Sequence, residues 1–205
     1  MASPSNSVRS TSVRLIGGRL SVDFANASAA ASALSWEHLI SFLNAARIVS
    51  SERGAQLLTL PQSDPQAAEG LLLKARRLAT SVRLAFSALA HKQPVVPKWI
   101  EPVNEILRIT EGHDELVSGG DGWQIEFIAK EAGLDWLLAA IARSTAEIIA
   151  EGSKAPLRLC ANPTCGLLFY DDSRTHRRRW CSMAVCGNRS KVAAFARKHS
   201  SRHSQ

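Results

Sequence analysis

CANPTCGLLFYDDSRTHRRRWCSMAVC, residues 160–186, is the stretch that decides how the last quarter of the chain folds. It holds two pairs of cysteines with the spacing C-x4-C-x15-C-x4-C. Zinc takes four soft or borderline ligands in a tetrahedron, and two cysteine pairs, each carried by a local turn, supply that number. The sequence therefore predicts Zn²⁺ as a cofactor, with four ligands: Cys160, Cys165, Cys181 and Cys186.

The residues around the cysteines predict the shape of this module. An Asn-Pro pair between the first two cysteines suits a tight turn, and apolar residues at 157–159 and 167–170 predict two short flanking strands. Ser182 is placed to cap a helical turn that carries Cys186. A knuckle, a hairpin, a basic loop and a helix follow one another in this order, which resembles a treble clef.

A second set of zinc ligands competes with the four cysteines. Cys181, Cys186, His199 and His203 have the spacing C-x4-C-x12-H-x3-H of a two-cysteine, two-histidine finger. Such a finger expects an aromatic residue after the second cysteine and a leucine near the first histidine, but serine and alanine occupy those places. It also leaves the first cysteine pair unused. The four-cysteine set is therefore favoured over this finger, and over four unlinked or redox-active thiols.

Positive charge is concentrated in the same quarter of the chain. The net charge is +7, yet residues 1–153 carry 14 basic and 16 acidic side chains, whereas residues 154–205 carry 11 basic and two acidic ones. This asymmetry indicates a polyanionic partner, and arginine forks suit phosphates and guanine edges of duplex DNA. Some of these arginines can also offset the −2 charge of four thiolates with one Zn²⁺. The predicted nucleic-acid contacts are Arg174, Arg177, Arg178, Arg179, Arg189, Lys191, Arg197 and Lys198.

The body, predicted as one domain over residues 17–153, has mostly helical periodicity. The RLSVDFANAS segment, which follows Gly17-Gly18, fits either a strand or a short helix, and periodicity alone leaves both open. A glycine-rich stretch at 118–122 predicts the turn of a β-hairpin. The fold class is therefore α+β, mainly α, followed by a small treble-clef-like zinc finger over 154–205. Helices are expected from Ser35 to about Val49, from Pro65 to about Ala90, over 98–109 and over 134–150.

The N-terminus and the apolar runs bear on the cellular compartment. Residues 1–16 are rich in serine and contain no acid, which predicts a disordered leader, with an organellar transit peptide as the alternative. The longest apolar runs, such as Trp136 to Ile141, are too short to span a bilayer, so no membrane partner is expected. A cytoplasmic location is expected, where thiols stay reduced and clustered cysteines bind metal.

Two stretches resemble a known family. WCSMAVCGNRSKVAAFARKH, residues 180–199, is similar to the signature of bacterial CGNR zinc-finger proteins, and residues 186–189 are the tetrapeptide that names them. Near the other end, GGRLSVDFANA from Gly17 resembles the opening of the ABATE domain that accompanies this finger. The resemblance implies a zinc-binding, stress-related transcription regulator.

These observations favour a regulator that binds DNA through its basic finger and is not an enzyme. The alternative is an RNA- or protein-binding zinc module, with the body as a small-molecule sensor or as the dimerisation domain of a homodimer. A hydrolytic zinc enzyme is disfavoured, because catalytic zinc keeps an open coordination position and four cysteines close it.

Overall fold

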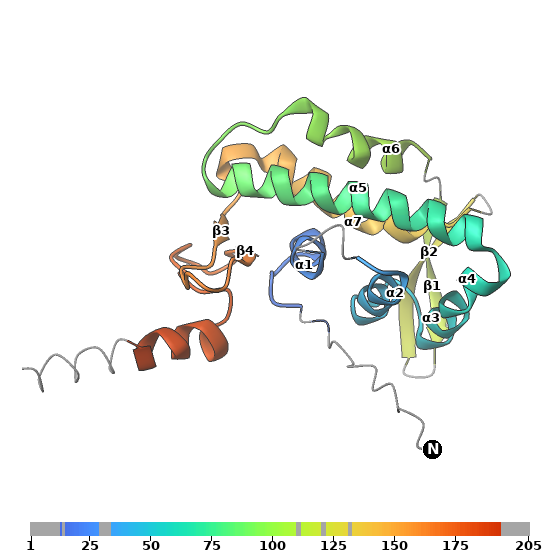
Figure 1. Ribbon diagram of the computed structural model, residues 1–205, viewed down its shortest axis with the longest axis horizontal. Coiled ribbons are helices and arrows are strands. Elements are labelled where there is room, and N and C mark those ends of the chain that lie inside the picture. Colours follow the sequence, from blue (N-terminus) through green and yellow to red (C-terminus); the bar gives the residue numbers. More distant parts are fainter. Residues whose placement is uncertain are drawn as a thin grey trace, which may run out of the picture.

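The computed structural model describes residues 13, 15–28, 34–109, 112–119, 122–130 and 133–193. It confirms the predicted fold class, since a mainly helical body carries one antiparallel hairpin and a cysteine-bearing module (Figure 1). No helix in these ranges is long and apolar enough to cross a membrane. The helices are α1 (Leu20–Ala27), α2 (Trp36–Ala45), α3 (Ser51–Leu58), α4 (Leu60–Ser63), α5 (Pro65–Ala90), α6 (Glu101–Ile109) and α7 (Trp136–Glu151), and the strands are β1 (Gly112–Gly119), β2 (Gly122–Ala129), β3 (Leu157–Leu159) and β4 (Leu168–Tyr170).

The long helix α5 is the element around which the body is built. Asp64 Oδ1 accepts a hydrogen bond from the Ala67 N–H at 3.0 Å, and Pro65 stands at the first turn, so the predicted helix start is confirmed. α5 contacts α1, α2, α6 and α7, and it also contacts β3 of the cysteine module. Its apolar stripe is buried as expected, with Leu78, Val82 and Phe86 fully buried.

Tertiary packing settles the segment whose periodicity was ambiguous. Residues 20–27 form helix α1, which contacts α5 and α7 and fully buries Val22, Phe24 and Ala25. The Asp23 carboxylate turns back and accepts a hydrogen bond from the Gly17 N–H at 2.7 Å. Burial raises the pKa of Asp23, although this bond and one from the Ile16 N–H act in the opposite direction.

The region after α2 differs from the prediction. The helix from Ser35 ends at Ala45 and not near Val49, because Arg47 adopts the left-handed conformation with φ of 57°. A further helix, α3, begins at Ser51, where the Ser50 hydroxyl accepts a hydrogen bond from the Arg53 N–H. The expected helix over 98–109 divides into a 3₁₀ turn, Pro97–Trp99, and α6.

Both hairpins pair antiparallel. β1 and β2 pair from Gly112↔Ala129 to Gly119↔Gly122, so the predicted hairpin is confirmed and its strands extend further into the expected turn. In the cysteine module, β3 and β4 pair from Leu157↔Tyr170 to Leu159↔Leu168, which confirms the two predicted short strands.

The β3–β4 hairpin contributes to two hydrophobic clusters. Leu157, Leu168 and Tyr170 are part of the large core of the body. Phe169 belongs instead to a small second cluster together with Cys160 and two other cysteines. Successive residues of a strand point to opposite faces, so β4 places one face on each cluster.

Candidate metal centre and basic surface

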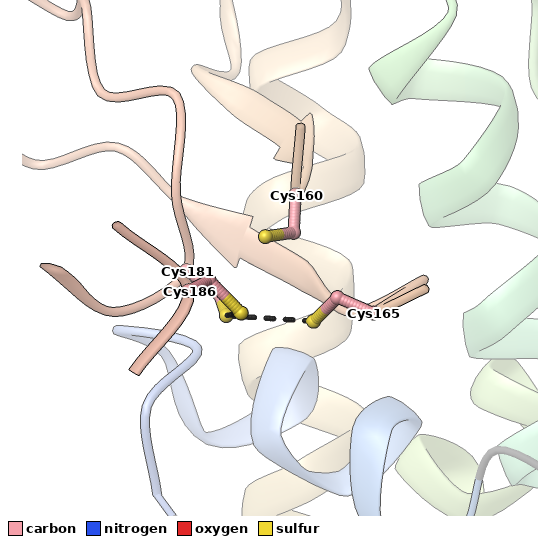
Figure 2. Close-up of side chains that lie close together, drawn as sticks. All are labelled: Cys160, Cys165, Cys181 and Cys186. Atoms are coloured by element: carbon pink, nitrogen blue, oxygen red, sulfur yellow. Dashed lines mark hydrogen bonds between the residues drawn. The ribbon is translucent and has the colours of Figure 1, made fainter. Parts of the chain in front are cut away.

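The structure brings the four cysteines together. Cys160 follows β3, Cys165 ends the next turn, Cys181 lies in the following loop, and Cys186 lies in the π-helical turn Met183–Gly187. Figure 2 shows their thiols pointing into one common space. All four Sγ atoms lie within 4.8 Å of one another, and the Cys165–Cys181 and Cys181–Cys186 sulfur distances are both 3.7 Å.

These distances fit a metal held by four thiolates. A tetrahedral zinc site with Zn–S bonds of about 2.3 Å has sulfur–sulfur edges of about 3.8 Å. A disulfide would instead need about 2.05 Å, and all four cysteines are free. Four soft ligands that converge from two loops match the donor set of a closed structural zinc site.

Backbone hydrogen bonds shape the first cysteine loop. The Cys160 N–H donates to the Leu167 carbonyl at 2.8 Å, and the Cys165 N–H donates to the Asn162 carbonyl at 2.9 Å. Gly166 then reverses the chain with φ of 64°, a conformation in which a Cβ is strained. These bonds turn the first two sulfurs toward the same point.

The second cysteine loop is held by the cap expected from the sequence. The Ser182 hydroxyl accepts a hydrogen bond from the Val185 N–H at 3.4 Å, and its carbonyl accepts one from the Cys186 N–H at 2.9 Å. This confirms Ser182 as the cap of the helical turn that carries Cys186.

The thiols of the cluster differ in their surroundings. Burial raises the pKa of Cys181 and of Cys165, because a desolvated thiolate is disfavoured. A hydrogen bond from Asn162 Nδ2 lowers the pKa of Cys186. A bound cation would favour the thiolate form of all four.

Arg178, predicted as a nucleic-acid contact, is engaged inside the module. Its backbone N–H donates to the buried Asp171 carboxylate at 2.9 Å, and its guanidinium donates to the Cys181 carbonyl at 3.0 Å. The same guanidinium pairs with Asp172 at 3.2 Å and lies 5.1 Å from the centre of the Phe169 ring. Arg178 therefore supports the loop that carries Cys181.

Asp171 is the acidic anchor of that loop. It is fully buried, and its Oδ1 accepts hydrogen bonds from the Ser173 N–H and hydroxyl. Burial by itself would raise the pKa of Asp171, but the bonds from Ser173 and Arg178 and the charge of Arg158 hold it below its ordinary value. The carboxylate thus stays charged at neutral pH.

The other predicted contacts within the described ranges are exposed. Arg174, Arg177, Arg189 and Lys191 are exposed and make no ion pair with a described residue. Arg179 is also exposed, and its guanidinium lies 5.3 Å from the centre of the Trp180 ring. Two predicted contacts, Arg197 and Lys198, and both histidines of the competing ligand set, His199 and His203, lie outside the described residues.

Three of the four basic residues of α5 have partners within the body. Lys74 pairs with Asp135 at 2.7 Å, and Arg77 pairs with Glu105 at 3.1 Å. Arg76 donates to the Leu34 carbonyl. This helix face is therefore a weaker candidate for a polyanion than the cysteine module.

Sequence reasoning missed two side chains that organise the site. Asn26 of α1 bonds the backbone of β4, and Asn162 bonds Cys186. Asn162 was visible in the sequence only as a turn-forming residue, and nothing in the sequence pointed to Asn26.

Comparison with known families agrees with this architecture of a helical domain followed by a zinc-finger-like cysteine cluster. Residues 18–152 match the ABATE model, described as "Putative stress-induced transcription regulator", and residues 157–199 match the CGNR zinc finger. The chain belongs to the ABATE family and carries a CGNR zinc finger, as the resemblance implied. No curated protein matches the chain.

Proposed function

We propose that this protein is a transcription regulator that binds zinc through Cys160, Cys165, Cys181 and Cys186 and binds duplex DNA through the surrounding basic surface. The observation that carries the proposal is the convergence of four Sγ atoms within 4.8 Å of one another, next to exposed cations. The family description, "Putative stress-induced transcription regulator", supports the same conclusion.

Zinc in this site would have a structural role. When bound, it links four thiolates and leaves no open position for a substrate. The protein supplies the two turns that present the sulfurs, and Arg178 and Asp171 fasten the loop between them. A module this short gains from the metal the folding free energy that its small core cannot provide.

The charge of the module suits a polyanion. Asp171 and Asp172 are its only acidic residues from 157 onward in the sequence. Asp171 is buried and bonded, and Asp172 pairs with Arg178. The exposed cations make no ion pair with a carboxylate of the described residues, which favours binding to phosphates. They are Arg174, Arg177, Arg179, Arg189 and Lys191.

The direct test is a binding titration of the zinc-loaded full chain with random duplex DNA over a series of salt concentrations. If the five exposed cations each neutralise one phosphate, log K falls against log salt with a slope of about −4.5. Absence of binding at low salt would contradict the proposal. Selection from random duplexes then reports whether a sequence is recognised, and the symmetry of the selected site reports whether the chain acts as a homodimer.

One contact favours a second candidate, which is binding to single-stranded RNA. Trp180 is half-buried and lies beneath the Arg179 guanidinium, and such an aromatic–arginine pair can stack on unpaired bases. Competition of single-stranded RNA against duplex DNA for the same protein separates the two candidates. A protein partner, a small-molecule effector of the body, the cytoplasmic location and the domain boundaries at 17–153 and 154–205 stay predictions.

A further inference from the structure

Asn162 joins the two cysteine loops. It lies between Cys160 and Cys165, is only 9% exposed, and its Nδ2 donates to the Sγ of Cys186 at 3.6 Å, 24 residues further along the chain. Among the described residues it is the one side chain, apart from the cysteines themselves, that forms a hydrogen bond with any of the four sulfurs.

The orientation of the Asn162 amide is fixed by its other bonds. Oδ1 accepts from the Thr164 N–H at 3.2 Å and from the Thr164 hydroxyl at 3.1 Å. A backbone N–H can only donate, so the atom that faces it is the amide oxygen, and the NH₂ group must face the sulfur. The Asn162 carbonyl also accepts from the Cys165 N–H, so the residue is held within its own loop.

The negative charge of the metal site gives the Asn162 N–H donor a role. Four thiolates with one Zn²⁺ carry a net charge of −2, and Cys160, Cys181 and Cys186 are 8%, 2% and 3% exposed. Buried negative charge is costly unless donors face it, and an N–H···S bond withdraws electron density from the thiolate. Arg178 reaches the cluster only through the Cys181 carbonyl. Asn162 acts on a sulfur directly.

We propose that Asn162 is a positioning residue of the metal centre: its amide orients and partly neutralises the Cys186 thiolate, and so strengthens zinc binding. This inference rests on the four-cysteine ligand set of the proposed function. Hydrogen-bond partners of metal ligands typically contribute about 10–100-fold to metal affinity. The four residues between Cys160 and Cys165 thus provide a donor to the second loop in addition to a turn.

Three variants of the full chain test the inference. Asn162→Asp keeps the shape and the acceptor but places a carboxylate oxygen against the sulfur, whereas Asn162→Ser replaces the amide with a shorter hydroxyl and so removes the N–H donor without adding charge. Thr164→Val is the matched control, because it removes a neighbouring hydroxyl and leaves the amide N–H in place. The measurements are the zinc dissociation constant, by competition with a chelator, and the energy of the sulfur-to-metal charge-transfer band after loading with Co²⁺.

We expect Asn162→Ser to weaken zinc binding about tenfold and Asn162→Asp to weaken it further. In both variants the charge-transfer band moves to lower energy, because the sulfur regains electron density, and Thr164→Val resembles the wild type. If both Asn162 variants keep the wild-type affinity within about twofold, the inference is wrong. It is also wrong if affinity falls while the band stays in place, since the residue then only shapes the loop.

The same experiment separates the inference from the proposed function. A wild-type chain that binds neither Zn²⁺ nor Co²⁺ refutes the metal site itself, and with it the inference. Should Asn162→Ser fail to fold, Asn162→Asp decides alone, because it retains the acceptor for both Thr164 hydrogen bonds.

Discussion

The side-chain amide of Asn26 in α1 forms two hydrogen bonds with the backbone of Leu168 in β4. Nδ2 donates to the Leu168 carbonyl at 2.8 Å, and Oδ1 accepts from the Leu168 N–H at 2.9 Å. One amide thus satisfies both polar groups of a strand residue, as a neighbouring strand would. Through these two hydrogen bonds the body holds the β3–β4 hairpin, whose strands lie on either side of the first cysteine loop.

Replacing Asn26 with aspartate is expected to weaken the junction of body and finger. The variant keeps an acceptor for the Leu168 N–H but sets a carboxylate oxygen against the Leu168 carbonyl, and the loss is about 2 kcal/mol of unfolding free energy. Urea unfolding of the zinc-loaded chain measures it. Asn104→Asp, on α6 and without a side-chain hydrogen bond to a described residue, is the control and changes stability little. Equal effects of the two variants would contradict the prediction.

Removing zinc is expected to destabilise the helical body as well as the finger. Leu157 and Tyr170 lie in the body core, and the Tyr170 N–H donates to the Gly17 carbonyl at 2.7 Å, so a loosened hairpin opens that core. Free zinc at 100 times its dissociation constant stabilises a folded chain by about 2.7 kcal/mol. Far-ultraviolet circular dichroism, which reports the helices, should therefore show a lower Tm with a chelator.

A chain with Cys160→Ser and Cys165→Ser controls for other effects of the chelator. Its helical transition should no longer respond to zinc or to chelation. If the wild-type helices melt at the same temperature with and without bound zinc, the body and the finger are energetically independent.

Two adjacent arginines are expected to differ in what they do. Arg178→Ala removes bonds to the Cys181 carbonyl and Asp172 and should cost about 2 kcal/mol of stability. Arg177→Ala, at an exposed position, should change stability by less than about 0.5 kcal/mol and reduce the salt slope of DNA binding by about 1. Thermal unfolding measures the stability of both variants, and the salt titration measures their DNA binding. Loss of DNA affinity in a fully stable Arg178→Ala chain would show that Arg178 is also a nucleic-acid contact, as the sequence predicts.

Asp23→Asn is expected to change the pH dependence of stability. The pKa of Asp23 is raised in the folded chain, mainly by burial, so its contribution is complete at acid pH and declines as pH rises through the folded-state pKa. The asparagine retains an acceptor for the Gly17 N–H and does not titrate. The free energy of unfolding of the variant, relative to wild type, should therefore rise with pH above about pH 4, the ordinary range of an aspartate pKa, until the folded-state carboxyl is fully ionised. A difference that is flat with pH would contradict this.

Local signals predicted most of the elements. Pro65 marked the start of α5, Ser182 marked a helical turn, and the cysteine spacing predicted the cluster. Each of these depends on residues close in sequence or on ligand chemistry. The helical state of residues 20–27 did not follow from sequence, since it depends on the partners α5 and α7.

The contacts that support the cysteine cluster could not be predicted from the sequence. Asn26 lies 142 residues before Leu168, and Asn162 lies 24 before Cys186, so only the folded chain places them together. The structural role of Arg178 was hidden for the same reason, because its charge looks like that of Arg177 until Asp171, Asp172 and Cys181 surround it.

The alternation of side-chain faces along β4 limits which insertions the strand can accept. Tyr170 and Leu168 face the body core, while Phe169 faces the cysteine cluster. A single inserted residue in the strand would exchange these faces and damage both cores at once, whereas a two-residue insertion preserves them. The finger therefore cannot be transferred to another protein without helix α1 and the body core to which β4 contributes.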